Sequence, residues 1–158
     1  MKRKHFLENW GIVVGIFTLF LTLAACDKDD DDNQPKTNYT LSAAANGAQE
    51  VPAVTTAATG TVTGTYNTST NALSYTVTWT GLSGAPILMH FHGPALAGAN
   101  ASPTLDITGF PATASGTFTG SATLTEAQEA DLLAGKWYWN AHTTANGSGE
   151  IRGQVSVQ

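Results

Sequence analysis

Cysteine and charge are scarce in this sequence of 158 residues, which has a single cysteine, 12% charged residues and only 7 lysines and arginines. One cysteine excludes an internal disulfide and every metal site built from several cysteines. Binding nucleic-acid phosphates takes clustered basic residues, so the small basic count and the net charge of −5 argue against a nucleic-acid partner. The 42% hydrophobic and 9% aromatic residues are enough for a core, and the length predicts one domain with an appendage.

The start of the chain has the layout of an export signal. Positions 2–4 are basic, and positions 10–25 form an uncharged, mostly apolar stretch. This stretch is shorter than the roughly 20 residues that a membrane-spanning helix needs. It fits the basic, apolar and small-residue regions of a secretory signal, so we predict that residues 1–25 are a signal peptide.

The apolar stretch ends in Leu23-Ala24-Ala25-Cys26, and Cys26 is the only cysteine. This ending resembles a bacterial lipobox, in which the leader is cut before the cysteine and the cysteine is lipidated. We therefore predict a lipoprotein signal peptide and attachment to a membrane through lipidated Cys26. A plain signal peptide, or an uncleaved anchor with an incidental cysteine, is the alternative.

An acidic segment follows the cysteine, with four consecutive aspartates at positions 29–32 and no apolar residue between 27 and 38 except Pro35. Such a segment predicts a solvated tether over residues 26–38. It lacks the glycine and distal glutamate of a calcium loop. An acidic run directly after a lipidated cysteine also resembles the signal that exports lipoproteins to the cell surface in some Gram-negative lineages. The predicted location is the bacterial outer membrane or cell surface.

Residues 39–158 have the pattern of an all-β domain. Between positions 72 and 81, apolar or aromatic residues alternate with serine and threonine, which is typical of a half-buried strand. Further strands are predicted at 39–43, 60–66, 87–92, 116–124, 136–143 and 150–157. Thr125-Glu126-Ala127-Gln128 forms a capping box for one short helix that Gly135 ends. Short strands with turn signals predict an antiparallel β-sandwich or barrel.

The three histidines beyond the predicted leader fall in two of these strands. On a strand over 87–92, His90 and His92 share one face, and Ile87, Met89 and Phe91 are predicted to face the core. His142 lies on the strand over 136–143, on the same face as Tyr138 and Asn140. If the two strands are neighbours, the three imidazoles converge on a site for copper or zinc. Asn140 or Glu150 could then orient a ring, whereas the alternative is that the histidines only bind backbone carbonyls.

The last predicted strand carries Glu150, Arg152 and Gln154 on one face. One interpretation is a structural clasp, in which Glu150 or another carboxylate pairs with Arg152. The other is that Arg152 binds an anionic ligand beside the histidines.

Several of these segments together resemble the CHRD domain, a family named for its occurrence in chordin and also found in secreted bacterial proteins. The matching segments occur in order along the domain: Gly47-Ala48-Gln49-Glu50-Val51-Pro52, Gly60, His90-Phe91-His92-Gly93-Pro94-Ala95, Leu132-Leu133-Ala134-Gly135, Asn140-Ala141-His142-Thr143 and Gly149-Glu150-Ile151-Arg152-Gly153-Gln154. The sequence departs from the family pattern at Trp137-Tyr138-Trp139 and at Asn146-Gly147-Ser148, and neither departure touches the histidines. The resemblance implies an immunoglobulin-like β-barrel.

Two functional hypotheses follow. The first is a non-catalytic, lipid-anchored binding module with an unidentified protein or glycan partner and a three-histidine metal site. The second is a small copper or zinc metalloenzyme, in which Arg152 steers an anion such as superoxide. The His-x-His strand and a later histidine are weakly similar to copper/zinc superoxide dismutase, but a fourth histidine and a cysteine pair are lacking beyond the leader. The sequence identifies no catalytic residue.

Overall fold

A computed structural model describes residues 35–158 of the chain. The predicted leader at 1–25, Cys26 and most of the predicted tether lie outside the described residues. Lipidation and export therefore stay predictions. Among residues 35–158, no helix is long and apolar enough to cross a membrane.

The described residues form an all-β domain with one short α-helix. The elements, in chain order, are β1 (Asn38–Asn46), the 3-10 helix η1 (Gly47–Gln49), β2 (Thr59–Asn67), β3 (Ala72–Thr80), β4 (Pro86–His92), β5 (Pro103–Ile107), β6 (Gly116–Thr123), α1 (Glu126–Leu133), β7 (Tyr138–Thr143), β8 (Ile151–Gln154) and β9 (Ser156–Val157). Helix α1 begins at the predicted capping box, where Thr125 and Gln128 bind each other's backbone N–H groups.

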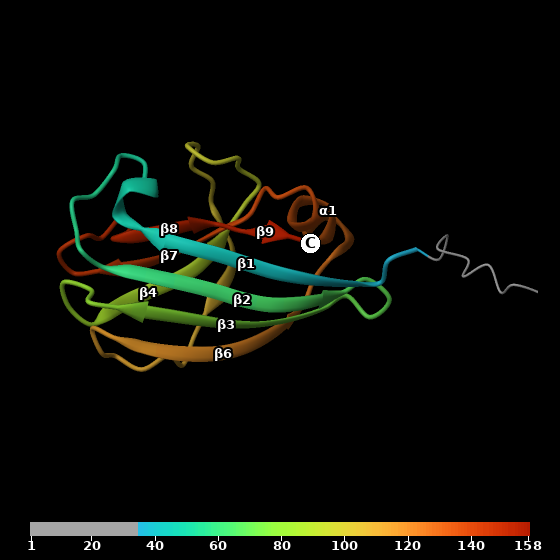
Figure 1. Cartoon of the computed structure of the whole chain (residues 1–158), viewed down its shortest axis with the longest axis horizontal. Helices are drawn as coiled ribbons and strands as arrows, with labels where there is room; N and C mark the ends of the chain where they lie inside the picture. Colours follow the sequence, from blue (N-terminus) through green and yellow to red (C-terminus); the bar gives the residue numbers. More distant parts are fainter. Residues whose placement is uncertain (1–34) are drawn as a thin grey trace, which may run out of the picture. The chain divides into compact units, whose positions relative to one another are not determined.

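The nine strands belong to one antiparallel sheet in the order β5-β4-β7-β8-β1-β2-β3-β6, with β9 paired to β1. Figure 1 shows β1, β2, β3 and β6 side by side, with β4, β7 and β8 behind them. The sheet curves into a nearly closed barrel-like form. The inner side holds the core, whose largest fully buried side chains are Trp79, Trp137, Trp139, Tyr66 and Phe91. This architecture confirms the predicted all-β class.

The outer side of β2, β3 and β6 is lined with hydroxyl groups. Pairing across the strands sets Thr63 beside Thr76 and Thr76 beside Thr119, and the last two hydroxyl oxygens lie 2.9 Å apart. The buried residues of β3 alternate with these hydroxyls along the strand. One face of this part of the sheet is therefore solvated and the other packs in the core.

The structure differs from the sequence-based expectations at β5 and at Ile87. Strand β5 was not predicted, because Pro103 and Asp106 are residues that strands disfavour. Ile87 was expected to face the core but is 50% exposed. The pairing of β4 with β7 shifts register between Pro86 and Leu88, so the alternation that holds for Met89 and Phe91 does not extend back to Ile87.

Gly60 on β2 allows close contact between the two halves of the sheet. A Cβ atom there would lie 2.7 Å from Cζ3 of Trp139 and 2.9 Å from the carbonyl oxygen of Thr78. Gly60→Ala is therefore expected to lower the free energy of unfolding by about 2 kcal/mol through overpacking. Urea denaturation measures the difference. Gly84→Ala is the matched control, because a Cβ at Gly84 meets nothing within 4 Å; equal losses in the two variants would contradict the expectation.

Candidate metal centre

The three predicted histidines lie on the outer face of neighbouring strands. Strands β4 and β7 pair directly, with His90 opposite Asn140, His92 opposite Tyr138 and Leu88 opposite His142. The other faces of both strands point into the core. The sequence predicts the site only if these two strands are neighbours, and the structure shows that they are.

The register brings the imidazoles into one cluster. One ring nitrogen from each of His90, His92 and His142 can be chosen so that all three lie within 4.8 Å of one another. Although the cluster lies on the outer face, the three residues are at most 9% exposed. The segments before β5 and before β8 contribute to this burial, since their carbonyl groups contact the rings.

Backbone carbonyls determine which nitrogen of two rings carries the proton. Nδ1 of His92 lies 2.9 Å from the carbonyl oxygen of Ala101, and Nδ1 of His142 lies 3.0 Å from that of Gly147. A carbonyl oxygen can only accept a hydrogen bond, so both Nδ1 atoms are protonated donors. The Nε2 atoms of His92 and His142 therefore carry lone pairs, the state in which histidine binds metals.

The spacing and hydrogen bonding of these nitrogens fit a metal ion. Nδ1 of His90 lies 3.2 Å from Nε2 of His142. Two nitrogens bound to zinc at about 2.0–2.1 Å in a tetrahedral site are roughly 3.3 Å apart. Nε2 of His92 is buried and has no hydrogen-bond partner within the described part of the chain. A buried polar atom without a partner destabilises a fold, and coordination to a metal ion would remove that cost.

Asn140 adds an oxygen to the cluster. Its Oδ1 atom lies 3.0 Å from Nε2 of His142. An amide oxygen and an unprotonated imidazole nitrogen both accept hydrogen bonds, so they approach favourably only when a proton or another cation joins them. Asn140, predicted as a residue that orients the rings, is thus in place beside His142, while Glu150 does not contact the histidines among the hydrogen bonds of residues 35–158.

Burial keeps the histidines neutral. It lowers the pKa of His90, His92 and His142 below the ordinary value of 6.5. The carboxylate of Asp106, 3.7 Å from Nε2 of His90, partly opposes this effect for His90. At neutral pH the cluster is therefore uncharged and able to coordinate a cation.

Arg152 lies beside the cluster but is separated from it by Tyr138. The ring of Tyr138 stacks on the imidazole of His92 at 4.7 Å between centroids, with 4° between the planes. The guanidinium carbon of Arg152 lies 3.4 Å from the centre of the same ring. Strands β4 and β8 flank β7 on opposite sides, so Tyr138 stands between His92 and Arg152.

The predicted pair between Glu150 and Arg152 does not form among the ion pairs of the described residues. Arg152 instead donates to Oδ1 of Asn100 at 3.1 Å and to the carbonyl oxygen of Ala99 at 2.7 Å. The carboxylate of Glu150 binds hydroxyl groups on other segments. Glu150 precedes β8, and Gly149 before it has a φ of +125°, so the strict alternation assumed from 150 to 152 breaks there.

The carboxylate of Glu50 lies near Arg152, and no pattern in the sequence predicted Glu50 as a site residue. It is 7% exposed, and its Oε1 atom is buried and forms no hydrogen bond with another of the residues that the structure describes. Burial raises the pKa of Glu50 to about 7, while the charge of Arg152 and contact with Asn140 act in the opposite direction. Glu50 lies in a loop after η1, where no periodicity indicates a role, although it belongs to the segment 47–52 that resembles the CHRD family.

The fold and the site define an all-β domain with a buried histidine cluster on the outer face of its sheet. The family model of the CHRD domain matches residues 41–155, so the chain belongs to the CHRD domain family. No curated protein and no solved structure matches the chain.

Proposed function

We propose that this protein is a lipid-anchored binding module of the cell surface whose CHRD domain holds one copper or zinc ion through His90, His92 and His142. The observation that carries the metal site is the buried Nε2 atom of His92, which has no hydrogen-bond partner among residues 35–158 and lies beside two further imidazoles. The lipid anchor and the surface location rest on the lipobox-like ending at Cys26 and on the aspartates after it.

Copper and zinc are the ions that this donor set favours. Neutral imidazole nitrogens bind both, whereas calcium and magnesium prefer oxygen ligands. The side-chain oxygens near the cluster come from the amide of Asn140, whose Oδ1 atom lies 3.0 Å from His142, and from the carboxylate of Asp106, whose side chain is 74% exposed. Three histidines leave one coordination position for a partner or substrate group.

The test of the metal site is stoichiometry. The full chain is purified in detergent, stripped of metal, supplied with copper or zinc in turn, passed through a desalting column and subjected to elemental analysis. We expect about one equivalent in the wild type and an affinity at least about tenfold lower in His92→Ala and in His142→Ala. Thr119→Ala, a hydroxyl on the solvated face of β6, is the matched control and is expected to bind normally. Loss of less than half the metal in both histidine variants would contradict the site.

The anchor has a separate test. Cys26→Ser is expected to abolish metabolic labelling of the chain with a radioactive fatty acid and to release the protein from the membrane fraction. Unchanged labelling would remove the lipoprotein part of the proposal and leave the metal site unaffected.

A further inference from the structure

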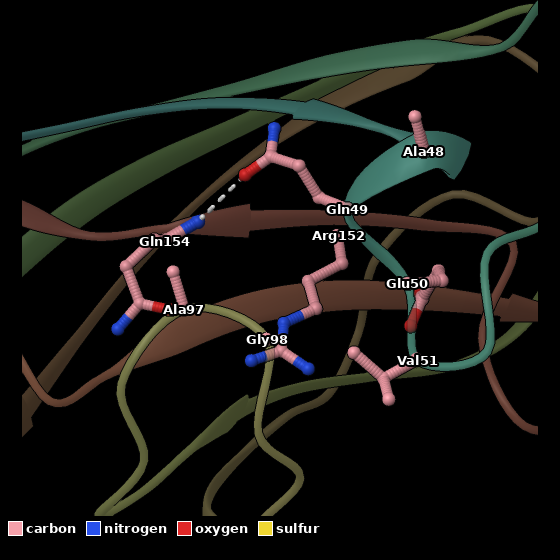
Figure 2. A pocket seen from close by; sticks show the side chains of 8 residues that line it. All are labelled: Ala48, Gln49, Glu50, Val51, Ala97, Gly98, Arg152 and Gln154. Carbon is pink, nitrogen blue, oxygen red and sulfur yellow. Dashed lines mark hydrogen bonds between the residues drawn. The ribbon is translucent and has the colours of Figure 1, made fainter.

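A hollow lies beside Arg152, on the other side of Tyr138 from the histidine cluster. This hollow of about 160 Å³ is lined by Ala48, Gln49, Glu50, Val51, Ala97, Gly98, Arg152 and Gln154. Figure 2 shows that these residues come from three parts of the chain: η1 with the segment after it, the loop that carries Ala97 and Gly98, and strand β8. Hydrogen bonds fix this arrangement, because Asn100 in the loop donates to the carbonyl oxygen of Val51 at 2.9 Å.

The hollow contains a buried positive charge with incomplete pairing. Arg152 is 1% exposed. Its two hydrogen-bond acceptors, Asn100 Oδ1 and the carbonyl oxygen of Ala99, are neutral, and no carboxylate of residues 35–158 forms an ion pair with it. A guanidinium group has five N–H donors, and a buried charge is stabilised when an opposite charge meets it. The fold therefore holds a cation ready for an anionic group.

The remaining walls suit a short carboxylate. Arginine presents N–H groups in a planar fork that matches the two oxygens of a carboxylate. The side chains of Ala48, Val51 and Ala97 give the hollow apolar surface for a short aliphatic part. Glu50 is the one acid in the lining, and its neutral form, which burial favours, can donate a hydrogen bond to a carboxylate oxygen.

We infer that this hollow is a binding site for the carboxylate group of a small aliphatic acid, held by the guanidinium of Arg152. The site is distinct from the histidine cluster, because the ring of Tyr138 lies between Arg152 and His92. It does not depend on the proposed metal, and either site can fail while the other stands.

The test uses the side-chain signals of arginine. The chain has two arginines, Arg3 and Arg152, so a nitrogen-15 spectrum of the full chain in detergent contains two Nε–Hε signals at most. Arg152→Lys identifies the signal of Arg152 by its disappearance. Titration with propionate is expected to shift that signal saturably in the millimolar range, whereas propionamide, which has the same shape without the charge, is expected to leave it in place.

Three variants make the result decisive. Ala97→Phe covers the hollow from an exposed position and is expected to weaken binding by at least about tenfold while the fold is retained. Arg152→Gln is expected to abolish binding as measured by calorimetry. Lys136→Gln, which removes a positive charge that pairs with Asp131 and does not line the hollow, is expected to bind normally. If Arg152→Gln does not fold, the affinity of Ala97→Phe for propionate tests the inference instead. Equal shifts with propionamide or with chloride at the same ionic strength, no saturation, or unchanged affinity in Ala97→Phe would each overturn the inference.

Discussion

Replacing Glu150 by alanine is expected to lower the free energy of unfolding by about 3 to 5 kcal/mol. The carboxylate of Glu150 is fully buried and accepts hydrogen bonds from the N–H and hydroxyl of Ser83, at 2.9 and 2.5 Å, and from the hydroxyls of Thr143 and Thr56, at 2.7 and 3.0 Å. Alanine leaves these donors without their acceptor in a site closed to water. It also disconnects three segments that the carboxylate joins.

The loss can be measured by urea denaturation monitored by tryptophan fluorescence at neutral pH. Glu126→Ala is the matched control, because Glu126 is exposed in the first turn of α1 and its loss is expected to change stability by less than about 0.5 kcal/mol. A Glu150→Ala variant as stable as the control would show that water replaces the carboxylate without cost.

The pH dependence of the Glu150 contribution has a definite sign. Burial by itself would raise the pKa of Glu150, but the hydrogen bonds from Ser83, Thr143 and Thr56 outweigh it and hold the pKa below 4.5. A carboxyl group whose pKa is lowered by folding stabilises the protein above its unfolded pKa. This stabilisation is lost as the pH falls below 4.5. The difference between wild type and Glu150→Ala is therefore expected to shrink in acid.

The histidine cluster shows what a sequence pattern can and cannot provide. Alternation along β4 predicts that His90 and His92 share a face, and the same rule places His142 with Asn140 on β7. In both strands, alternation relates only residues that are close in the sequence. That β4 and β7 are neighbours depends on pairing between segments about 50 residues apart, for which periodicity gives no signal. The sequence therefore predicts the three-histidine site only if β4 and β7 are assumed to pair.

The errors around the site also have local causes. Alternation predicts that Glu150 and Arg152 share a face of one strand, but the strand begins at Ile151, and the backbone at Gly149 turns Glu150 toward Ser83. Glu50 gave no periodic signal because it follows a single turn of 3-10 helix. The position of the Glu50 side chain depends on residue 149 being glycine, because a Cβ atom at Gly149 would collide with Oε1 of Glu50. Periodic patterns in the sequence therefore do not predict the contacts that irregular segments contribute to the site.

Glu50 itself supplies the second large effect. Because burial raises its pKa to about 7 from 4.5, the folded protein holds a proton that the unfolded chain has already released over this range. The contribution of Glu50 to the free energy of folding is therefore least favourable above pH 7, where the buried carboxyl group is charged. It becomes more favourable as the pH falls toward 4.5. The shift corresponds to about 3 kcal/mol between these limits.

Glu50→Gln is expected to remove this pH dependence, because glutamine has a similar shape and no proton to release. Denaturation curves of wild type and Glu50→Gln are compared at about pH 4.5, 6, 7 and 8.5. We expect the variant to gain about 3 kcal/mol relative to wild type as the pH rises across this range. The histidines, whose lowered pKa values make folding more favourable as the pH rises, contribute equally to both curves and cancel in the difference. A constant difference would mean that Glu50 is already ionised in the folded state and neutralises Arg152, in which case the nearby hollow would have no unpaired charge to offer a carboxylate.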